Sequence, residues 1–205
     1  FHDDREHGVF ISFNYFQREY KRVRYKEKVL HSMLTDLLRK RGYDVLREEL
    51  GLVYAFETFR FSYLSFEYDI WGYKCSAETE KFPELLDAIH EFIFKGLLSF
   101  LKSEDGQWWF DHSVSRYIFP NTTSYDENYA ESRALNILEG HDIYLFDKAV
   151  KVARTLTRQD LIDHIEKNLI SLRPHVWISS AEKDDAMLRT LHASDLHRQL
   201  ERDGV

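Results

Sequence analysis

Two pairs of histidines are the residues of this sequence that first suggest metal chemistry. They are His2 with His7, and His192 with His197, five positions apart in each pair. That spacing is roughly 140° around a helix of 3.6 residues per turn. Zinc motifs on helices place two histidines so that both face one metal ion. Because neither pair does so, we predict that this chain holds no zinc and that these histidines are solvated.

A few other side chains have types suited to catalysis or binding. Glu48 and Glu49 could act as acid and base, although adjacent carboxylates on a helix usually form a solvated face. His90 and His164 lie beside apolar positions, and we interpret them as residues of helix flanks rather than ligands. The aromatic run 108–110 could line a protein interface or pack in the core. The sequence contains neither a glycine-rich phosphate loop nor a serine or cysteine nucleophile motif.

The composition is that of an ordinary folded protein rich in aromatic rings. Of 205 residues, 43% are hydrophobic, 31% charged and 15% aromatic, so rings must build much of the core or of a groove. The net charge of -7 argues against nucleic acid as the main partner, because phosphate binding needs a basic face. The single cysteine, Cys75, excludes an internal disulfide. No apolar run approaches the ~20 residues of a membrane span.

The N-terminal half alternates strand and helix patterns. The run 9–16 predicts a strand, and runs 53–64 and 66–75 predict an antiparallel hairpin. From about residue 25 to residue 41, apolar residues recur at helical spacing. They are Leu30, Met33, Leu34, Leu37 and Leu38. Gly42 is expected to cap or kink this helix, and Gly51 marks the break between helical and extended patterns.

The C-terminal half is mainly helical. Pro83 is expected in the first turn of a helix whose apolar face extends to Phe100. Further helices are predicted around 108–110, ended by Pro120 and Asn121, and over 125–139 and 142–154. Residues 157–160 resemble a capping box that opens another helix, and 175–179 predict the last strand. The polar tail after residue 182 is expected to end in a helix.

This order of elements predicts an α+β fold in which an antiparallel β-sheet has helices packed on one face. The length fits one domain over residues 1–205. Because the chain begins with Phe1 rather than methionine, we expect it to be a processed or excised part of a longer chain.

Three sequence strings, taken in order, carry a resemblance to a known family. The first is residues 46–54 (LREELGLVY), which fits L-R-E-x-x-G-L-x-Y between a helix and a strand pair. The second is residues 80–83 (EKFP), before a long helix, and the third is residues 156–161 (LTRQDL), before the last strand. Their order and spacing resemble half of an insulinase-type zinc metallopeptidase, the family of pitrilysin and the mitochondrial processing peptidase.

The resemblance implies an α+β half of a shell-like enzyme that closes around a peptide. Catalysis in that family needs the motif H-x-x-E-H, which this sequence lacks. The resemblance therefore implies the non-catalytic half, with zinc expected in a homologous partner domain or subunit. It also implies that Arg47 and Tyr54 contact the peptide substrate. Tyrosine can donate a hydrogen bond to the oxyanion of a tetrahedral intermediate, and arginine can hold a carbonyl or carboxylate.

The residues leave alternatives open at both levels. Arg47 could instead be a solvated charge at a helix end, and Tyr54 a core or strand-face ring. For the whole chain, the first hypothesis is a substrate-binding half that assists peptide-bond hydrolysis by a zinc-bearing partner. The second is a structural or interaction protein of the same fold with no peptidase role. The third is an autonomous hydrolase with an unrecognised site.

Overall fold

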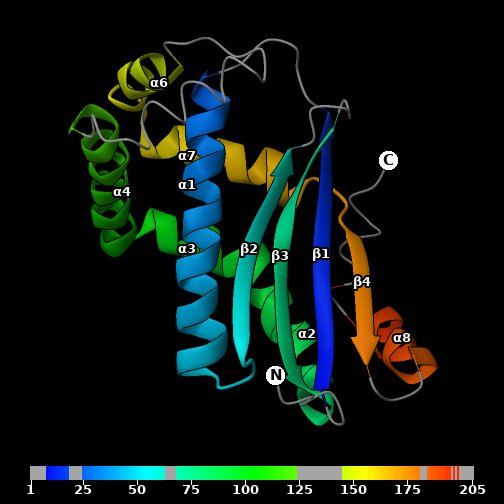
Figure 1. Ribbon diagram of the computed structural model, residues 1–205. Helices are drawn as coiled ribbons and strands as arrows, with labels where there is room; N and C mark the ends of the chain where they lie inside the picture. The colour runs from blue at the N-terminus through cyan, green and yellow to red at the C-terminus, as the bar shows by residue number, and fades with distance from the viewer. Residues whose placement is uncertain are drawn as a thin grey trace.

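The computed structural model describes residues 8–18, 25–62, 68–123, 145–180, 184–194, 196 and 198. Within them, an antiparallel sheet has the strand order β2-β3-β1-β4, and helices pack against one of its faces (Figure 1). The predicted α+β fold with an antiparallel sheet is therefore confirmed. The predicted helix over 125–139 and three of the paired histidines, His2, His7 and His197, lie outside the described residues.

The strands follow the predicted runs closely. They are β1 Gly8–Arg18, β2 Ala55–Ser62, β3 Tyr68–Glu78 and β4 His175–Ser180. The predicted hairpin is the antiparallel pair of β2 and β3. β1 and β3 occupy the centre of the sheet, and β2 and β4 lie at its edges.

One face of the two central strands forms the floor of the core. Its buried side chains are Val9, Ile11, Phe13 and Tyr15 of β1, and Trp71, Tyr73, Cys75 and Ala77 of β3. The register pairs Phe13 with Tyr73 and Tyr15 with Trp71. The rings of these pairs stack, with centroid distances of 4.7 and 4.6 Å respectively. Directly opposed aromatic pairs of this kind stabilise a sheet and fix its register.

The opposite face of the sheet is open and carries exposed rings from β1 and β4, namely Phe10, Phe16 and Trp177. Gly72 of β3 lies on the central part of the sheet, opposite Asn14 of β1. A β-carbon at Gly72 would collide with the backbone oxygen of Phe13. The close approach of the two central strands therefore requires glycine at this position.

The long helix before the hairpin is α1, Tyr25–Gly42, and its five predicted apolar residues are all buried. The prediction that Gly42 caps this helix is wrong. Gly42 has helical backbone angles (φ -63, ψ -41), and the chain continues as the wider helical segment η2, Tyr43–Glu49. The reason for glycine is packing, because a β-carbon at Gly42 would collide with the buried ring of Phe56.

The remaining helical segments are η3 Thr79–Lys81, α2 Phe82–Glu91, η4 Phe92–Gly96, α3 Leu97–Lys102, α4 Glu104–Thr123, α6 Leu145–Ala153, α7 Arg158–Ile165, η5 Glu166–Ile170 and α8 Asp184–Ala193. Pro83 lies in the first turn of α2, as predicted. α4 continues to Thr123, so the prediction that Pro120 and Asn121 end it is wrong. Among the described residues, no helix is both long and apolar enough to cross a membrane.

The capping box predicted at residues 157–160 is present at the start of α7. The Thr157 hydroxyl accepts a hydrogen bond from the Asp160 backbone N–H, and the Asp160 carboxylate accepts one from the Thr157 N–H. Asp160 also pairs with Lys26 of α1 at 2.5 Å. These contacts lower the pKa of Asp160, with the Lys26 hydrogen bond as the main cause. The box therefore joins α7 to α1 as well as starting the helix.

His164 of α7 is buried, contrary to the prediction that it lies on a helix flank. Its ring centroid lies 5.9 Å from that of His31, and the Asn168 amide nitrogen lies 3.1 Å from its Nδ1 atom. Burial lowers the pKa of His164 from 6.5 to about 4; the charge of Glu27 opposes this shift and that of Lys167 adds to it. The folded protein therefore keeps this imidazole neutral at pH 7.

We predict that His164 makes stability depend on pH. The unfolded chain protonates this histidine near pH 6.5, whereas the folded chain does so near pH 4. Between these values the unfolded state binds more protons. The free energy of unfolding should be highest above about pH 6.5 and should fall by up to about 3 kcal/mol as the pH is lowered to about 4.

Urea unfolding between about pH 4.5 and 7.5 checks this expectation. His164→Gln should flatten the slope over that range, because glutamine does not titrate. The matched control is His112→Gln, at an exposed histidine of α4, which should keep the slope of the unmodified protein. Equal slopes for the unmodified protein and His164→Gln would contradict the prediction.

A second prediction concerns the centre of the sheet. Gly72→Ala should lower the free energy of unfolding by about 2 kcal/mol or more, because the added methyl group forces β1 and β3 apart. In the control Gly96→Ala, the nearest atom to the added carbon is 3.5 Å away. That helical substitution should cost nothing and could add up to about 1 kcal/mol. Equal effects in thermal or denaturant unfolding would be evidence against this register.

Candidate functional site

Residues 46–54 form a helix end, a tight stop and the approach to β2. Gly51 adopts the left-handed conformation, with a φ of +62. Its N–H donates to the carbonyl of Arg47 at 3.1 Å, and the N–H of Leu52 donates to the carbonyl of Leu46 at 2.9 Å. Glycine adopts this conformation without steric penalty, which is why it commonly ends helices. The predicted break at Gly51 is present.

Burial near both ends of this segment leaves the residues between them and Tyr54 facing solvent. Leu46, Leu52 and Val53 are buried and anchor the segment to the core. The side chain of Arg47 keeps 46% of its surface exposed, and Tyr54 keeps 58%. Both predicted site residues therefore lie on the accessible side of the same short segment, and Tyr54 is not a core ring.

Arg47 is held only loosely by its neighbours. Its guanidinium carbon lies 5.0 Å from the ring centroid of Tyr43, a cation–π arrangement. Its Nε atom lies 3.8 Å from a carboxylate oxygen of Glu48. A hydrogen bond with Glu48 raises the pKa of Tyr43. Glu48 and Glu49 are both exposed, as residues of a solvated face are.

Tyr54 belongs to a short polar chain that joins two of the three sequence strings. Its hydroxyl donates to Glu78 Oε1 at 3.1 Å. Lys81 Nζ lies 3.3 Å from Glu78 Oε2 and donates to the carbonyl of Gly51 at 3.4 Å. Lys81 and, to a lesser degree, Tyr54 lower the pKa of Glu78. The fold thus brings residues 46–54 and 80–83 together, whereas the string 156–161 lies at the start of α7.

An apolar hollow of about 400 Å³ adjoins this segment. Its floor is formed by side chains of η2, the Gly51 turn, α2 and η4, among them Val45, Leu50, Leu52 and Phe92. Three acidic residues of α2 line the hollow, namely Glu84, Asp87 and Glu91, and Arg41 is its basic residue. Leu50 is half exposed. A peptide side chain bound near Arg47 and Tyr54 would find apolar surface here.

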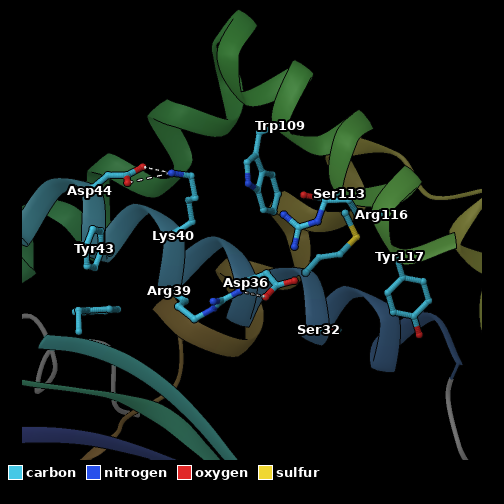
Figure 2. Close-up of a pocket in the computed structure, with 12 residues that line it drawn as sticks. Ser32, Asp36, Arg39, Lys40, Tyr43, Asp44, Trp109, Ser113, Arg116 and Tyr117 are labelled. Carbon is cyan, nitrogen blue, oxygen red and sulfur yellow. Dashed lines mark hydrogen bonds and ion pairs between the residues drawn. The ribbon is translucent and has the colours of Figure 1, made fainter. Parts of the chain in front are cut away.

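A larger cleft of about 620 Å³ opens between the α1–η2 helix and α4 (Figure 2). We call it the α1–α4 cleft. It is lined by Ser32, Met33, Asp36, Arg39, Lys40, Tyr43, Asp44, Phe56, Trp109, Ser113, Arg116 and Tyr117. α6 packs against both α1 and α4 and so holds the two helices in place beside the cleft.

This cleft was not predicted from the sequence, although some of its residues follow a local pattern. Asp36, Arg39 and Lys40 recur at helical spacing on the polar side of α1, which marks one helix face. Which helix faces them depends on tertiary packing. The three aromatic residues 108–110 differ in burial. Trp108 is exposed and stacks on His112, whereas Trp109 and Phe110 are buried.

The part of the chain that the structure describes contains no cluster of side chains suited to binding a metal ion. No group of three or more histidine, cysteine, aspartate and glutamate side chains there could hold a metal ion. Cys75 is buried in the sheet, and burial raises the pKa of its thiol to about 12. A thiol of that kind is inert as a nucleophile or ligand at neutral pH.

Comparisons with known proteins agree with the resemblance. Residues 2–96 match the family model described as "Peptidase M16 inactive domain". No curated protein matches the sequence significantly. Among solved structures, the periplasmic protease PqqL from Escherichia coli matches over 85% of this chain with a TM-score of 0.66 and 13% identity. Pitrilysin matches over 86% with a TM-score of 0.59 and 17% identity.

The M16 inactive domain from Pseudomonas fluorescens matches over 86% of this chain, with a TM-score of 0.60 and 11% identity. This chain covers 19% of PqqL, 18% of pitrilysin and 41% of the Pseudomonas fluorescens protein. It therefore spans less than half the length of each of these proteins. The resemblance to pitrilysin-type M16 peptidases, and to their inactive domain in particular, is confirmed.

Because Gly51 has a left-handed backbone conformation, its replacement by another residue should destabilise the protein. A β-carbon at this position would meet no atom within 4 Å, so any cost of substitution comes from the backbone conformation alone. Gly51→Ala should destabilise the protein by roughly 1 kcal/mol, and Gly51→Asn by less, because asparagine tolerates left-handed angles better. Denaturant unfolding of both variants checks the order. A more stable Gly51→Ala would contradict the assigned turn.

Proposed function

We propose that this chain, whose residues 2–96 match the inactive domain of M16 peptidases, is a zinc-free, substrate-binding half of such a peptidase. It would assist peptide-bond hydrolysis by a zinc-bearing homologous domain, on the same chain or on a partner subunit. The observation that carries this proposal is the match to an inactive domain in a chain whose Arg47 and Tyr54 both face solvent on one segment.

Tyr54 is the candidate for a donor to the reacting carbonyl. Its hydroxyl now donates to Glu78, which Lys81 keeps ionised. A substrate oxygen could take the place of that exposed carboxylate without the burial of any unpaired group. A donor aimed at a developing oxyanion contributes more in the transition state than in the ground state.

Arg47 is the candidate for holding the peptide itself. Its guanidinium is planar, stays charged at every physiological pH and makes only a long contact with Glu48. Stacking on Tyr43 orients the plane without using its hydrogen-bond donors. These donors are suited to a peptide carbonyl or carboxylate. Zinc bound in the partner would activate a water molecule and polarise the scissile carbonyl, while this chain binds and orients the peptide.

A second candidate function is an interaction protein of the same fold with no peptidase role. The open face of the sheet favours it, because Phe10, Phe16 and Trp177 are exposed there, the last of them to 67%. Exposed aromatic side chains are common anchors of contacts between proteins. This alternative predicts that Arg47 and Tyr54 can be replaced without any effect on a partner's turnover.

Reconstitution distinguishes the two functions. The chain alone should contain no zinc and cleave no peptide, and it should restore activity to the H-x-x-E-H domain encoded with it. Tyr54→Phe should then lower kcat of the mixture by about 100- to 1,000-fold, and Arg47→Gln should lower kcat/KM because the guanidinium no longer holds the peptide. Arg154→Gln, at an exposed position at the end of α6, is the control and should leave kcat/KM unchanged.

Circular dichroism and thermal unfolding of each variant exclude a folding defect as the cause of lost turnover. If the partner's turnover requires this chain but is unchanged by both substitutions, the result favours the interaction protein. Full activity of the zinc-bearing domain in the absence of this chain would contradict the proposal that this chain is half of the enzyme.

A further inference from the structure

The charges that line the α1–α4 cleft do not cancel. Three cationic side chains and two acidic ones face it. Asp36 pairs with Arg39 at 3.1 Å, and Asp44 pairs with Lys40 at 3.1 Å. The third cation, Arg116, makes no ion pair with any residue that the structure describes. One positive charge therefore remains available for a ligand.

Arg116 is placed where a ligand could use it. It is exposed, and it projects from α4 toward the space between Trp109 and Asp36 (Figure 2). Both acidic side chains of the cleft already have a cationic partner at hydrogen-bond distance, so neither is committed to the Arg116 guanidinium. A guanidinium presents parallel N–H donors that match the two oxygens of a carboxylate.

Beside its charged residues and two serines, the cleft has an aromatic and apolar part. Trp109 keeps 9% of its surface exposed, and Phe56 and Met33 are more deeply buried. All three line the cleft. The indole N–H of Trp109 makes no hydrogen bond within the described residues. Polar and apolar side chains share the walls of the cleft, and its volume of about 620 Å³ is enough for a small ligand that carries both kinds of group.

From these features we infer that the α1–α4 cleft binds a monoanionic ligand, a carboxylate attached to an aromatic or large apolar group. The carboxylate pairs with Arg116, and the apolar group packs against Trp109, Met33 and Phe56. A single negative charge matches the single uncompensated cation of the cleft. A free aromatic acid and the C-terminal residue of a peptide both carry this chemistry.

This inference is independent of the proposed function, because it concerns the 205-residue chain without any zinc-bearing partner. Isothermal titration of that chain tests it with N-acetylphenylalanine and with its amide. The acid should bind at least tenfold more tightly than the amide, and raising the salt concentration should weaken the acid's binding. A five-residue peptide ending in phenylalanine, with a free or an amidated C-terminus, forms the second arm.

Two substitutions at the cleft and one elsewhere complete the test. Arg116→Gln should remove the preference for the acid over the amide, and Arg116→Lys should retain part of it, because the charge stays but the paired donors are lost. Arg189→Gln, at an exposed position of α8, is the matched control and should leave the preference intact. Circular dichroism of each variant confirms that the fold is unchanged.

Each outcome decides the inference. A tighter complex with the free-acid peptide than with N-acetylphenylalanine supports it and identifies a peptide C-terminus as the source. Equal affinities for the two acids support it and identify a small aromatic acid as sufficient. Equal binding of acid and amide, an undiminished preference in Arg116→Gln, or no binding of any of the four compounds at millimolar concentration would overturn it.

Discussion

The stacked aromatic pairs between β1 and β3 are the constraint on which the rest of the fold depends. Phe13 faces Tyr73 and Tyr15 faces Trp71 in register, at the centre of the sheet. A slip by one residue would turn these rings to the open face. Burial raises the pKa of Tyr15 and Tyr73 far above the usual range, so both rings stay neutral. The helices pack on the floor that these pairs create.

A second constraint follows from the first at the edge of the same sheet. Phe56 of β2 packs 5.7 Å from Tyr73, centroid to centroid, and extends the stack. Its ring fills the space left by the missing side chain of Gly42, so α1 can pass directly over the hairpin. The helix then continues to Gly51 before the chain reverses. The position of the exposed segment with Arg47 and Tyr54 is thus set by core packing.

The two hollows lie on different sides of one continuous helix. Asp44 connects them, because it pairs with Lys40 of the α1–α4 cleft at 3.1 Å and lies 3.6 Å from Arg41, which lines the smaller hollow. The smaller hollow has acidic groups around an apolar floor, whereas the cleft has an uncompensated cation. Ligands of opposite charge would therefore suit the two places.

The sequence by itself determined the features that depend on neighbours along the chain. Helical spacing identified the buried face of α1, alternation identified the strands, and Thr157 with Asp160 identified the start of α7. The stop at Gly51 was also readable, because left-handed backbone favours glycine wherever it occurs. The resemblance to M16 peptidases rested on such local strings, and their order survived although overall identity to the solved structures is low.

Only the tertiary structure decided features that depend on residues distant in the chain. Gly42 was expected to cap or kink α1, but glycine is needed there because the ring of Phe56 occupies the space of a side chain. His164 looked like a flank residue, but α7 turns it into the core beside His31. The α1–α4 cleft exists because α6 packs against both helices, which brings Arg116 to the polar face of α1. Local periodicity records which face of a helix is polar, but not which other helix it meets.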